Sequence, residues 1–264
     1  MGKEIDHSKM PREFDPSSVI KLMRSHRSVR DFKSDPVPDE ITREIIHSAR
    51  WASTTHYRQT YSVIAIKHQD KKESLWQLCG RQRWIKECPL FFVFCADMNR
   101  LDFICRQHNK RVNLQHTETF LMAILDVGLF MQNAALAAES FDLGIVMIGG
   151  IRDRMRQVIE LLELPYGVFP VSGMCVGYPK QDSKQSPRLP LDEVLYWETY
   201  QPEGRSTRLD EYDQQVIKAS VYSPKNGKRR GWSEAMAANT SKPPREGTRI
   251  NIREIVKEQG FELR

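Results

Sequence analysis

The chain has 264 residues, of which 40% are hydrophobic and 28% are charged, and its formal net charge at pH 7 is +6. These values are typical of a soluble globular protein with a sizeable core, in one large domain or two small ones. The sequence has no run of about 18 apolar residues and no apolar N-terminal segment, so we expect neither a membrane span nor a secretory signal.

The N-terminal half alternates between helical and strand patterns. Residues 1–16 read as an irregular lead-in, and Ser17 is a good N-cap for a helix that we expect to end in the segment 26–30. A second helix should start at Pro38 and stop where the hydroxyl run at 53–55 competes for backbone hydrogen bonds. Further expected elements are a strand at 61–67, a polar helix at 70–80, a buried strand at 90–97 and an exposed helix at 100–111.

The C-terminal half starts with the longest apolar helix, at 117–141. This helix is apolar on most sides, so we expect it to be buried and to be a candidate subunit interface. After Pro190 the sequence becomes less apolar. The elements expected in this half are a strand at 144–150 that enters a glycine turn, a helix at 152–162, a strand at 168–179, and helices near 208–222 and 250–259.

These patterns predict an α+β fold in which helices flank a mixed sheet of four or five strands. The expected parts are the lead-in 1–16, a ligand-binding domain at 17–190, and an extension at 191–264 that wraps the core or a partner subunit. The extension contains a basic loop, 223–232, that we expect to be mobile. No GxGxxG motif follows a strand, which argues against a Rossmann domain.

Four short segments carry groups that suit a phosphorylated, planar ligand. In HRSVR (26–30) two arginines flank a serine and can grip phosphate, although the same charges would also complement a helix C-terminus. The hydroxyls at 53–55 can bind a phosphate or a ribityl chain, or only cap a helix. The glycines at 149–150 let a flat ligand approach the backbone, or only form a turn. Arg188, held between prolines, is a preorganised cation or an ordinary surface residue.

Other reactive side chains point to no metal or disulfide chemistry. The five cysteines form no CxxC pair, which fits a reducing cytoplasm, and Cys88 beside Pro89 could be exposed. The seven histidines show no metal-ligand spacing. Asp126, inside the apolar helix, is expected to be a hydrogen-bonded structural carboxylate, with a buried proton donor as the alternative.

Several segments, taken in order, resemble the nitroreductase superfamily, and in particular its NADPH-dependent flavin oxidoreductases and oxygen-insensitive nitroreductases. The similarity runs from about residue 17 to the last residue. The segments that carry it are HRSVRDF (26–32), SARWAST (48–54), GRQRW (80–84), FFVFCAD (91–97), AAESFDLGIVMIGGIR (137–152), VFPVSGMCVGYP (168–179), SPRLP (186–190), EYD (211–213), NGKRRGWS (226–233) and EQGF (258–261).

The resemblance implies an intertwined homodimer with one FMN in each of two pockets at the subunit interface. Tyr57 would lie beside the substrate, and no protein side chain would be catalytic because FMN carries the chemistry. The residues that the resemblance implies for FMN are His26, Arg27, Ser28, Arg30, Ser53, Thr54, Thr55, Gln82, Met147, Ile148, Gly149, Gly150 and Arg188.

Two loops depart from the family pattern. The loop before the Pro-Arg pair often carries a lysine; here that position is Ser186, so either one phosphate contact is missing or Lys184 replaces it. In related enzymes arginines of a tail loop grip the 2′-phosphate of NADPH, and lysine lacks their bidentate fork. NADPH is therefore the favoured donor and NADH an alternative. The basic residues of this loop are Lys225, Lys228, Arg229 and Arg230.

The expected activity is ping-pong transfer of hydride from NAD(P)H, through FMN, to a nitroaromatic, a quinone or a free flavin. One alternative is a specialised flavoprotein of the same superfamily with another reaction, against which the basic tail loop argues. The second is a non-catalytic protein that binds small ligands or nucleic acid. The basic clusters lack the interleaved aromatics of a single-strand binder, so we expect no nucleic-acid partner.

Overall fold

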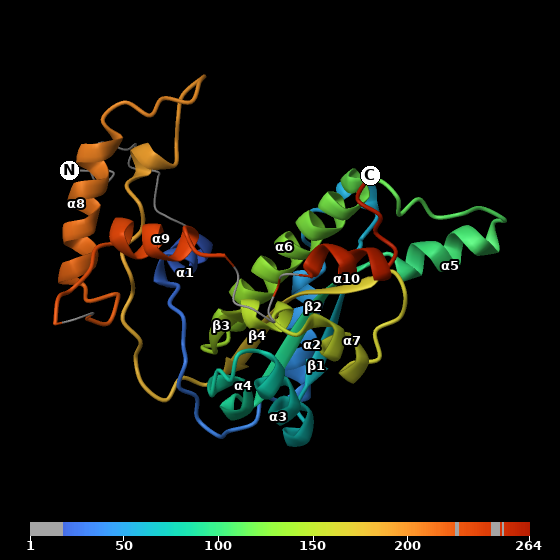
Figure 1. The fold of residues 1–264 in the computed structure, drawn as a ribbon. Coiled ribbons are helices and arrows are strands. Elements are labelled where there is room, and N and C mark those ends of the chain that lie inside the picture. Colours follow the sequence, from blue (N-terminus) through green and yellow to red (C-terminus); the bar gives the residue numbers. More distant parts are fainter. Residues whose placement is uncertain (1–17, 225–226, 244–248, 250) are drawn as a thin grey trace. The chain divides into compact units, whose positions relative to one another are not determined.

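The computed structural model describes residues 18–224, 227–243, 249 and 251–264. The chain divides into two compact units (Figure 1). The sheet unit comprises His26–Ser183 and Pro244–Arg264, and the tail unit comprises Met1–Ser25 and Lys184–Pro243. Residues 1–16, predicted to be an irregular lead-in, lie outside the described residues.

The sheet unit contains four strands in the order β1-β2-β4-β3. Its strands are β1 (Tyr61–Ile66), β2 (Leu90–Asp97), β3 (Gly144–Ile148) and β4 (Val168–Gly177). Its helices are α2 (Asp39–Ala49), η2 (Thr55–Tyr57), α3 (Gln69–Leu78), α4 (Trp84–Glu87), α5 (Asn99–Gln107), α6 (Thr117–Glu139), η3 (Gly149–Arg152), α7 (Met155–Leu161) and α10 (Ile252–Glu258).

The α+β class is confirmed, but the sheet is not mixed in its strand pairing. All three pairings between the named strands are antiparallel. The parallel contact in the described part of the chain is an isolated bridge between Ser28 and Ile145, on the side of β3 that no other strand covers.

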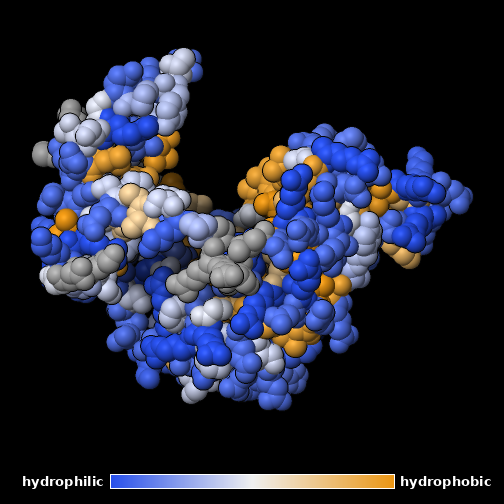
Figure 2. Space-filling view, in the orientation of Figure 1, coloured by the Kyte–Doolittle hydropathy of each residue, from blue (hydrophilic) through white to orange (hydrophobic). Residues whose placement is uncertain are grey.

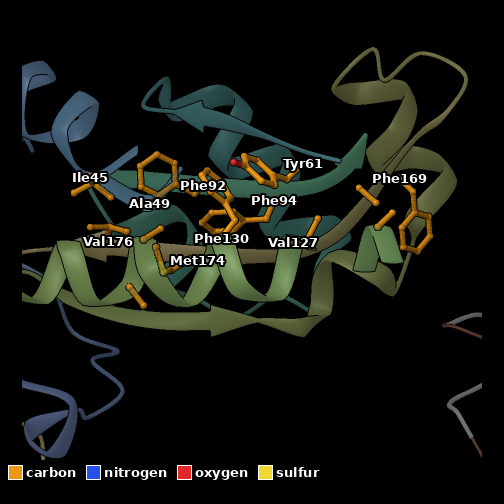
Figure 3. Packing of buried hydrophobic residues seen from close by; sticks show 14 of the residues in the cluster. Ile45, Ala49, Tyr61, Phe92, Phe94, Val127, Phe130, Phe169, Met174 and Val176 are labelled. Carbon is orange, nitrogen blue, oxygen red and sulfur yellow. The ribbon is translucent and has the colours of Figure 1, made fainter. Parts of the chain in front are cut away.

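Strand β2 is buried along its whole length, as its continuous apolar sequence predicted. Alternate side chains enter two different cores, since successive residues of a strand point to opposite faces. Phe92 and Phe94 pack into the core beneath α6, and Phe91 and Val93 pack into a second core on the other face. Figure 3 shows Phe94 between strand and helix, together with Phe130 of α6.

Helix α6 joins the sheet through aromatic contacts on one face only. The ring of Phe130 stacks on Tyr61 with centroids 4.3 Å apart and meets Phe94 edge-on at 5.8 Å. The opposite face carries Leu121, Leu125 and Leu129, which are 55%, 57% and 40% exposed. The expected burial of the helix therefore holds for one face, and the opposite face is exposed in the single chain. Figure 2 shows hydrophobic surface gathered over α6.

Among the described residues, α6 is also the one helix long and apolar enough to cross a membrane by length and composition. A core helix passes the same test, and the packing of α6 on the sheet is of that kind. Asp126, fully buried in the middle of this helix, makes several hydrogen bonds to a neighbouring loop.

The tail unit contains α1 (Ser18–Ser25), η4 (Leu191–Glu193), α8 (Arg205–Lys218) and α9 (Trp232–Thr240). Helix α9 was not expected from the sequence, because its nine residues show little helical periodicity. Asp213 of α8 stabilises its start by accepting hydrogen bonds from the amide and hydroxyl of Ser233. A side chain at Gly231 would collide with Asp213, which explains the glycine before α9.

One local expectation is wrong, and the open question of whether Cys88 is exposed is answered. Helix α1 ends at Ser25, and the segment 26–30 is extended instead of helical, because its backbone pairs with the open edge of β3. Cys88 is fully buried, since Lys72 and the second core enclose the turn before β2. The five cysteines are free thiols, and burial raises the pKa of Cys79 and of Cys95 to about 12.

Candidate functional site

The HRSVR segment is attached to the edge of β3. The amide of Val29 donates to the carbonyl of Ile145 over 2.9 Å, and Val29 itself is buried. Residue 144 must be glycine for this contact, because a Cβ there would lie 2.5 Å from Val29 Cγ2. Side chains alternate along extended backbone, so Ser28 and Arg30 lie on the side opposite buried Val29.

The imidazole of His26 and the guanidinium groups of Arg27 and Arg30 each have a partner in the sheet unit. His26 Nδ1 lies 2.6 Å from Oε1 of Glu139, the last residue of α6. Arg27 donates to Asp182 over 3.0 Å. The guanidinium of Arg30 lies over the indole of Trp84, 5.8 Å from the ring centroid. These partners hold the cations in place, and arginine in such a setting is suited to phosphate.

The glycine turn at the end of β3 brings Gln82 to the same strand. Gly150 is buried, and a Cβ there would lie 2.5 Å from the carbonyl oxygen of Cys79 and 2.9 Å from Gln82 Nε2. Gln82 Nε2 also donates to that carbonyl over 3.2 Å. Only glycine permits this approach of two backbones. Strand β3 therefore carries HRSVR near its start and the turn with Gln82 at its end.

The other β3 positions differ in what they offer a ligand. Met147 is half-buried, whereas the Ile148 side chain is fully buried in the core. At Ile148 only the backbone is therefore suited to a ligand. Gly149 is half-buried, and its missing side chain leaves the α-carbon open toward two guanidinium groups.

These two guanidinium groups belong to Arg152 and Arg249. A Cβ at Gly149 would lie 3.3 Å from Arg152 Nη2 and 3.8 Å from Arg249 Nη2. Arg249 donates to the Gly149 carbonyl over 3.1 Å and pairs with Asp153 at 2.6 Å. Burial, and then the positive charge of Arg249, lower the pKa of Arg152. Two like charges this close favour an anionic ligand between them.

Both arginines line a cavity of about 630 Å³ between η3, α7 and the chain around residue 251. Sequence reasoning noted Arg152 only as the end of the glycine turn and missed Arg249. Arg249 is 100 residues from Gly149 along the chain, so no local pattern links them. The cavity is lined by Arg152, Asp153, Arg154, Met155, Arg156, Gln157, Glu160, Arg249, Asn251 and Ile255.

The hydroxyl run at 53–55 is held by Asp126 of α6. One carboxylate oxygen accepts from Thr54 Oγ1 over 2.6 Å and from the amide and hydroxyl of Thr60 over 3.2 and 2.9 Å. The other accepts from the amide of Thr55 over 2.7 Å. Burial raises the pKa of Asp126, but these hydrogen bonds outweigh it and the net pKa is lowered. Asp126 is therefore an ionised structural carboxylate and not a proton donor.

The same contacts decide which hydroxyls face outward. The Thr54 hydroxyl donates to Asp126 and accepts from the amide of Gln59, so it serves the loop. Ser53 is exposed and Thr55 is half-buried. Tyr57 is 82% exposed at the tip of the loop. This loop presents Ser53, Thr55 and Tyr57 at the surface of the sheet unit.

The hydroxyl loop and the HRSVR segment do not meet within one chain. Asp126 anchors the first and Glu139 the second, and these residues are 13 positions apart on the same helix. At 1.5 Å per residue the two anchors are about 20 Å apart. The structure thus brings His26–Arg30, Gln82 and the glycine turn together, and it places Ser53, Thr54 and Thr55 at a separate position along α6.

The remaining predicted residues lie in the tail unit. Arg188, Lys228 and Arg229 are exposed, and Arg230 is half-buried with its Nε lacking a hydrogen-bond partner in the described part of the chain. Lys225 lies outside the described residues. Ser186 and Lys184 are both exposed. The assignment of Arg188 to FMN and of the basic loop to NADPH stays a prediction.

Comparison with known proteins identifies the family. The model described as "Nitroreductase family" matches residues 23–178, and that of "Nitroreductase family, C-terminal domain" matches residues 186–264. The chain is 35% identical to an FMN reductase [NAD(P)H] of Bacillus subtilis over 94% of its length and 99% of that protein. It is 36% identical to an oxygen-insensitive NADPH nitroreductase of Salmonella typhimurium over 94% of its length and 100% of that protein.

Solved structures agree. The structure of Bacillus megaterium NfrA1 is 40% identical and superimposes with a TM-score of 0.85, covering 93% of this chain and 99% of the other. The antiparallel sheet, the long core helix and the segments along β3 thus define an α+β protein of the nitroreductase fold. The chain belongs to the nitroreductase family.

Proposed function

We propose that this protein is an FMN-dependent oxidoreductase that transfers hydride from NAD(P)H to electron-poor acceptors such as nitroaromatics, quinones or free flavins. The observation that carries the proposal is the grouping of HRSVR, Gln82 and the glycine turn along β3. Family membership supports it, because the relatives named above are FMN reductases and nitroreductases.

The donor groups along β3 fit an FMN. Arg27 and Arg30 of HRSVR supply the charge that a phosphate needs, and each is held by a partner. In the glycine turn the half-buried Gly149 leaves its backbone open to a flat ring, and the Gln82 amide lies beside the neighbouring, buried Gly150. Arg152 and Arg249 add positive charge at Gly149, which would stabilise a ring that carries negative charge.

FMN, when bound, supplies the hydride chemistry by accepting hydride from a nicotinamide and passing it to a second substrate. The residues of this chain bind and orient the cofactor and both substrates. Successive occupation of one binding place predicts ping-pong kinetics. No side chain needs to form a covalent bond, and Asp126, being ionised, holds a loop and supplies no proton.

We also propose that the active form is a homodimer. The leucines of α6 form an exposed apolar stripe at 121, 125 and 129, which a second copy of the helix would cover. The anchors Asp126 and Glu139 lie about 20 Å apart in one chain. One subunit's hydroxyl loop would therefore complete the site that the other subunit forms with HRSVR. In this arrangement the part of the extension that belongs to the tail unit, residues 191–243, wraps the partner subunit.

NADPH is the favoured donor, because the tail loop keeps Lys228, Arg229 and Arg230 for a 2′-phosphate. The location that we propose is the cytoplasm, where the five cysteines, all free, would stay reduced. We expect no nucleic-acid or membrane partner for the assembled enzyme.

The decisive experiment is the visible spectrum of the purified protein, followed by anaerobic addition of NADPH and then of NADH. The proposal predicts flavin bands that either nucleotide bleaches, with the faster rate for NADPH. A colourless protein that neither binds added FMN nor gains activity from it would overturn the proposal. Sedimentation of the holoenzyme tests the dimer separately, and a monomer with full activity would contradict it.

A further inference from the structure

The loop after α2 has a backbone shape that its own residues do not favour. His56, Tyr57 and Gln59 have φ angles of 50°, 58° and 53°, in the left-handed region. None of the three is glycine, so each conformation costs free energy. Such a loop needs contacts from elsewhere in the protein to keep its shape.

Those contacts come mainly from the single carboxylate of Asp126. Its four hydrogen bonds hold the loop on both sides of the left-handed residues, at Thr54 and Thr55 before them and at Thr60 after them. Arg100 adds one hydrogen bond to the carbonyl of Gln59 over 3.0 Å. Between these anchors, His56 and Tyr57 are exposed at the tip.

The loop also lies on the part of α6 that carries the exposed leucines. Arg58 donates to the sulfur of Met122 over 3.2 Å, one helical turn before Asp126. Leu121 and Leu125 flank Met122 and are more than half exposed. The tip of the loop and the leucine stripe therefore share one region of surface, which is the surface that the proposed dimer would cover.

We propose that Asp126 is a positioning residue that acts across the subunit interface, by fixing the loop with Ser53, Thr55 and Tyr57 in the shape that completes the partner subunit's flavin and acceptor site. This inference rests on the proposed function. According to this inference, a residue in the core of one subunit affects the cofactor that is bound by the other subunit. Asp126 itself touches neither cofactor nor substrate.

The first test compares Asp126→Asn with Val127→Ala, a cavity variant of the next residue of α6, which is also fully buried. Asparagine keeps the size but sets an NH₂ group against hydrogen-bond donors. We expect Asp126→Asn to raise the Kd for FMN about tenfold and to slow reoxidation by a nitroaromatic. Val127→Ala should lower the Tm and leave both quantities close to wild type. Equal effects of the two variants would overturn the inference.

Thr60→Val provides a milder variant in case Asp126→Asn does not fold. It removes one hydroxyl donor and leaves the carboxylate and the Thr54 and Thr55 contacts in place. The Kd for FMN should rise by about threefold, whereas Thr60→Ser, which keeps the hydroxyl, should restore it. A Thr60→Val enzyme with the wild-type Kd would contradict the positioning role.

Hybrid dimers test the action across the interface. Co-expression of differently tagged Asp126→Asn and Arg30→Ala chains gives dimers with one variant in each subunit. If Asp126 acts on the partner's site, both defects fall in one site and the other site is intact, so each hybrid binds one FMN with the wild-type Kd. If Asp126 acts within its own subunit, each site carries one defect and no tight site remains, which would overturn the inference.

The controls separate this inference from the proposed function. A wild-type protein that binds no FMN, or that is an active monomer, contradicts the proposed function, and the inference with it. A wild-type dimer with two tight FMN sites, combined with a hybrid that has none, contradicts the inference alone.

Discussion

The last residue of helix α6, Glu139, lies 2.6 Å from Nδ1 of His26 through its Oε1 atom. The second carboxylate oxygen, Oε2, is buried and has no hydrogen-bond partner in the described part of the chain. The carboxylate therefore orients the imidazole at the start of HRSVR, as a carboxylate fixes the tautomer and ring of a ligand-binding histidine elsewhere. Helix α6 thus contacts a candidate FMN-binding segment at its C-terminal end.

We expect Glu139→Ala to weaken FMN binding about tenfold, because the His26 ring would lose its orienting partner. Glu139→Gln keeps an acceptor for the Nδ1 proton and should lose less. Fluorescence titration of the apoprotein with FMN measures both constants. Glu118→Ala, an exposed position in the first turn of the same helix, is the control and should bind as wild type. Equal Kd values for all these variants would exclude the orienting role of Glu139.

Asp126 should make the free energy of unfolding fall as the solution becomes acidic. Its pKa in the folded state is lowered, so its contribution is full above the unfolded pKa of about 3.9 and is lost as pH falls through the folded pKa. Asp126→Asn should lower the free energy of unfolding at pH 7 by about 1–3 kcal/mol. Urea titrations from neutral pH downward should show this difference shrinking below about pH 4. A difference that stays constant with pH would mean that the charge has no such role.

Arg249 should contribute to the binding of an anionic substrate, because it stands with Arg152 over Gly149. We expect Arg249→Ala to raise the KM for NADPH or for a carboxylated nitroaromatic about tenfold, with little change in FMN content. Steady-state kinetics with each substrate varied in turn measure this effect. Arg156→Ala is a matched control in the same cavity, because Arg156 forms a double ion pair with Glu258. A similar rise in KM for Arg156→Ala would mean that the loss of any positive charge from the cavity has this effect.

The basic loop of the tail unit should determine which nucleotide is preferred. Combined Lys228→Ala and Arg229→Ala should raise the KM for NADPH about tenfold and leave the KM for NADH nearly unchanged, because only NADPH carries the 2′-phosphate. Lys218→Ala, at the exposed end of α8, tests whether any loss of charge has this effect. If both nucleotides lost affinity equally, the loop would not read the 2′-phosphate.

Gly150 should be replaceable only at a cost in stability. A methyl group there would lie 2.5 Å from the backbone oxygen of Cys79, and a backbone atom gives way less easily than a side-chain end. We expect Gly150→Ala to lose about 1–3 kcal/mol of unfolding free energy. Gly149→Ala, whose new methyl would meet the flexible end of Arg152 at 3.3 Å, should lose less. Urea denaturation of both variants in the absence of FMN compares the two costs, and the reverse order would contradict the packing described above.

The parts of the fold that the sequence predicted are those with strong local patterns. The apolar run of β2 and the break of α2 before residue 53 are examples, since each depends on residues close in the chain. The segment 26–30 was misread as a helix end because its conformation depends on the open edge of β3, more than 100 residues further on. The sequence of α6 is apolar on most sides, so it could not show which side packs on the sheet and which side carries exposed leucines.

For the candidate site, the sequence alone could find residue types but not their distances. The order of short motifs predicted HRSVR, Gln82 and the glycine turn, and β3 does bring these three together. It could not predict that Thr54 faces Asp126 instead of a ligand, because that hydrogen bond joins residues 72 positions apart. The contact between Arg249 and Gly149 is of the same long-range kind.

The left-handed residues at the tip of the loop after α2 define how the acceptor range of this enzyme could be altered. Their backbone is fixed by anchors outside the tip, so the side chains at 56 and 57 can be exchanged without removing any of those anchors. Asparagine, aspartate and glycine accept this conformation readily, whereas valine, isoleucine, threonine and proline do not. A mutant library limited to the tolerated residues at these two positions would keep most members folded. In the proposed dimer it would thereby direct selection for new substrates to two exposed side chains at the tip of the loop.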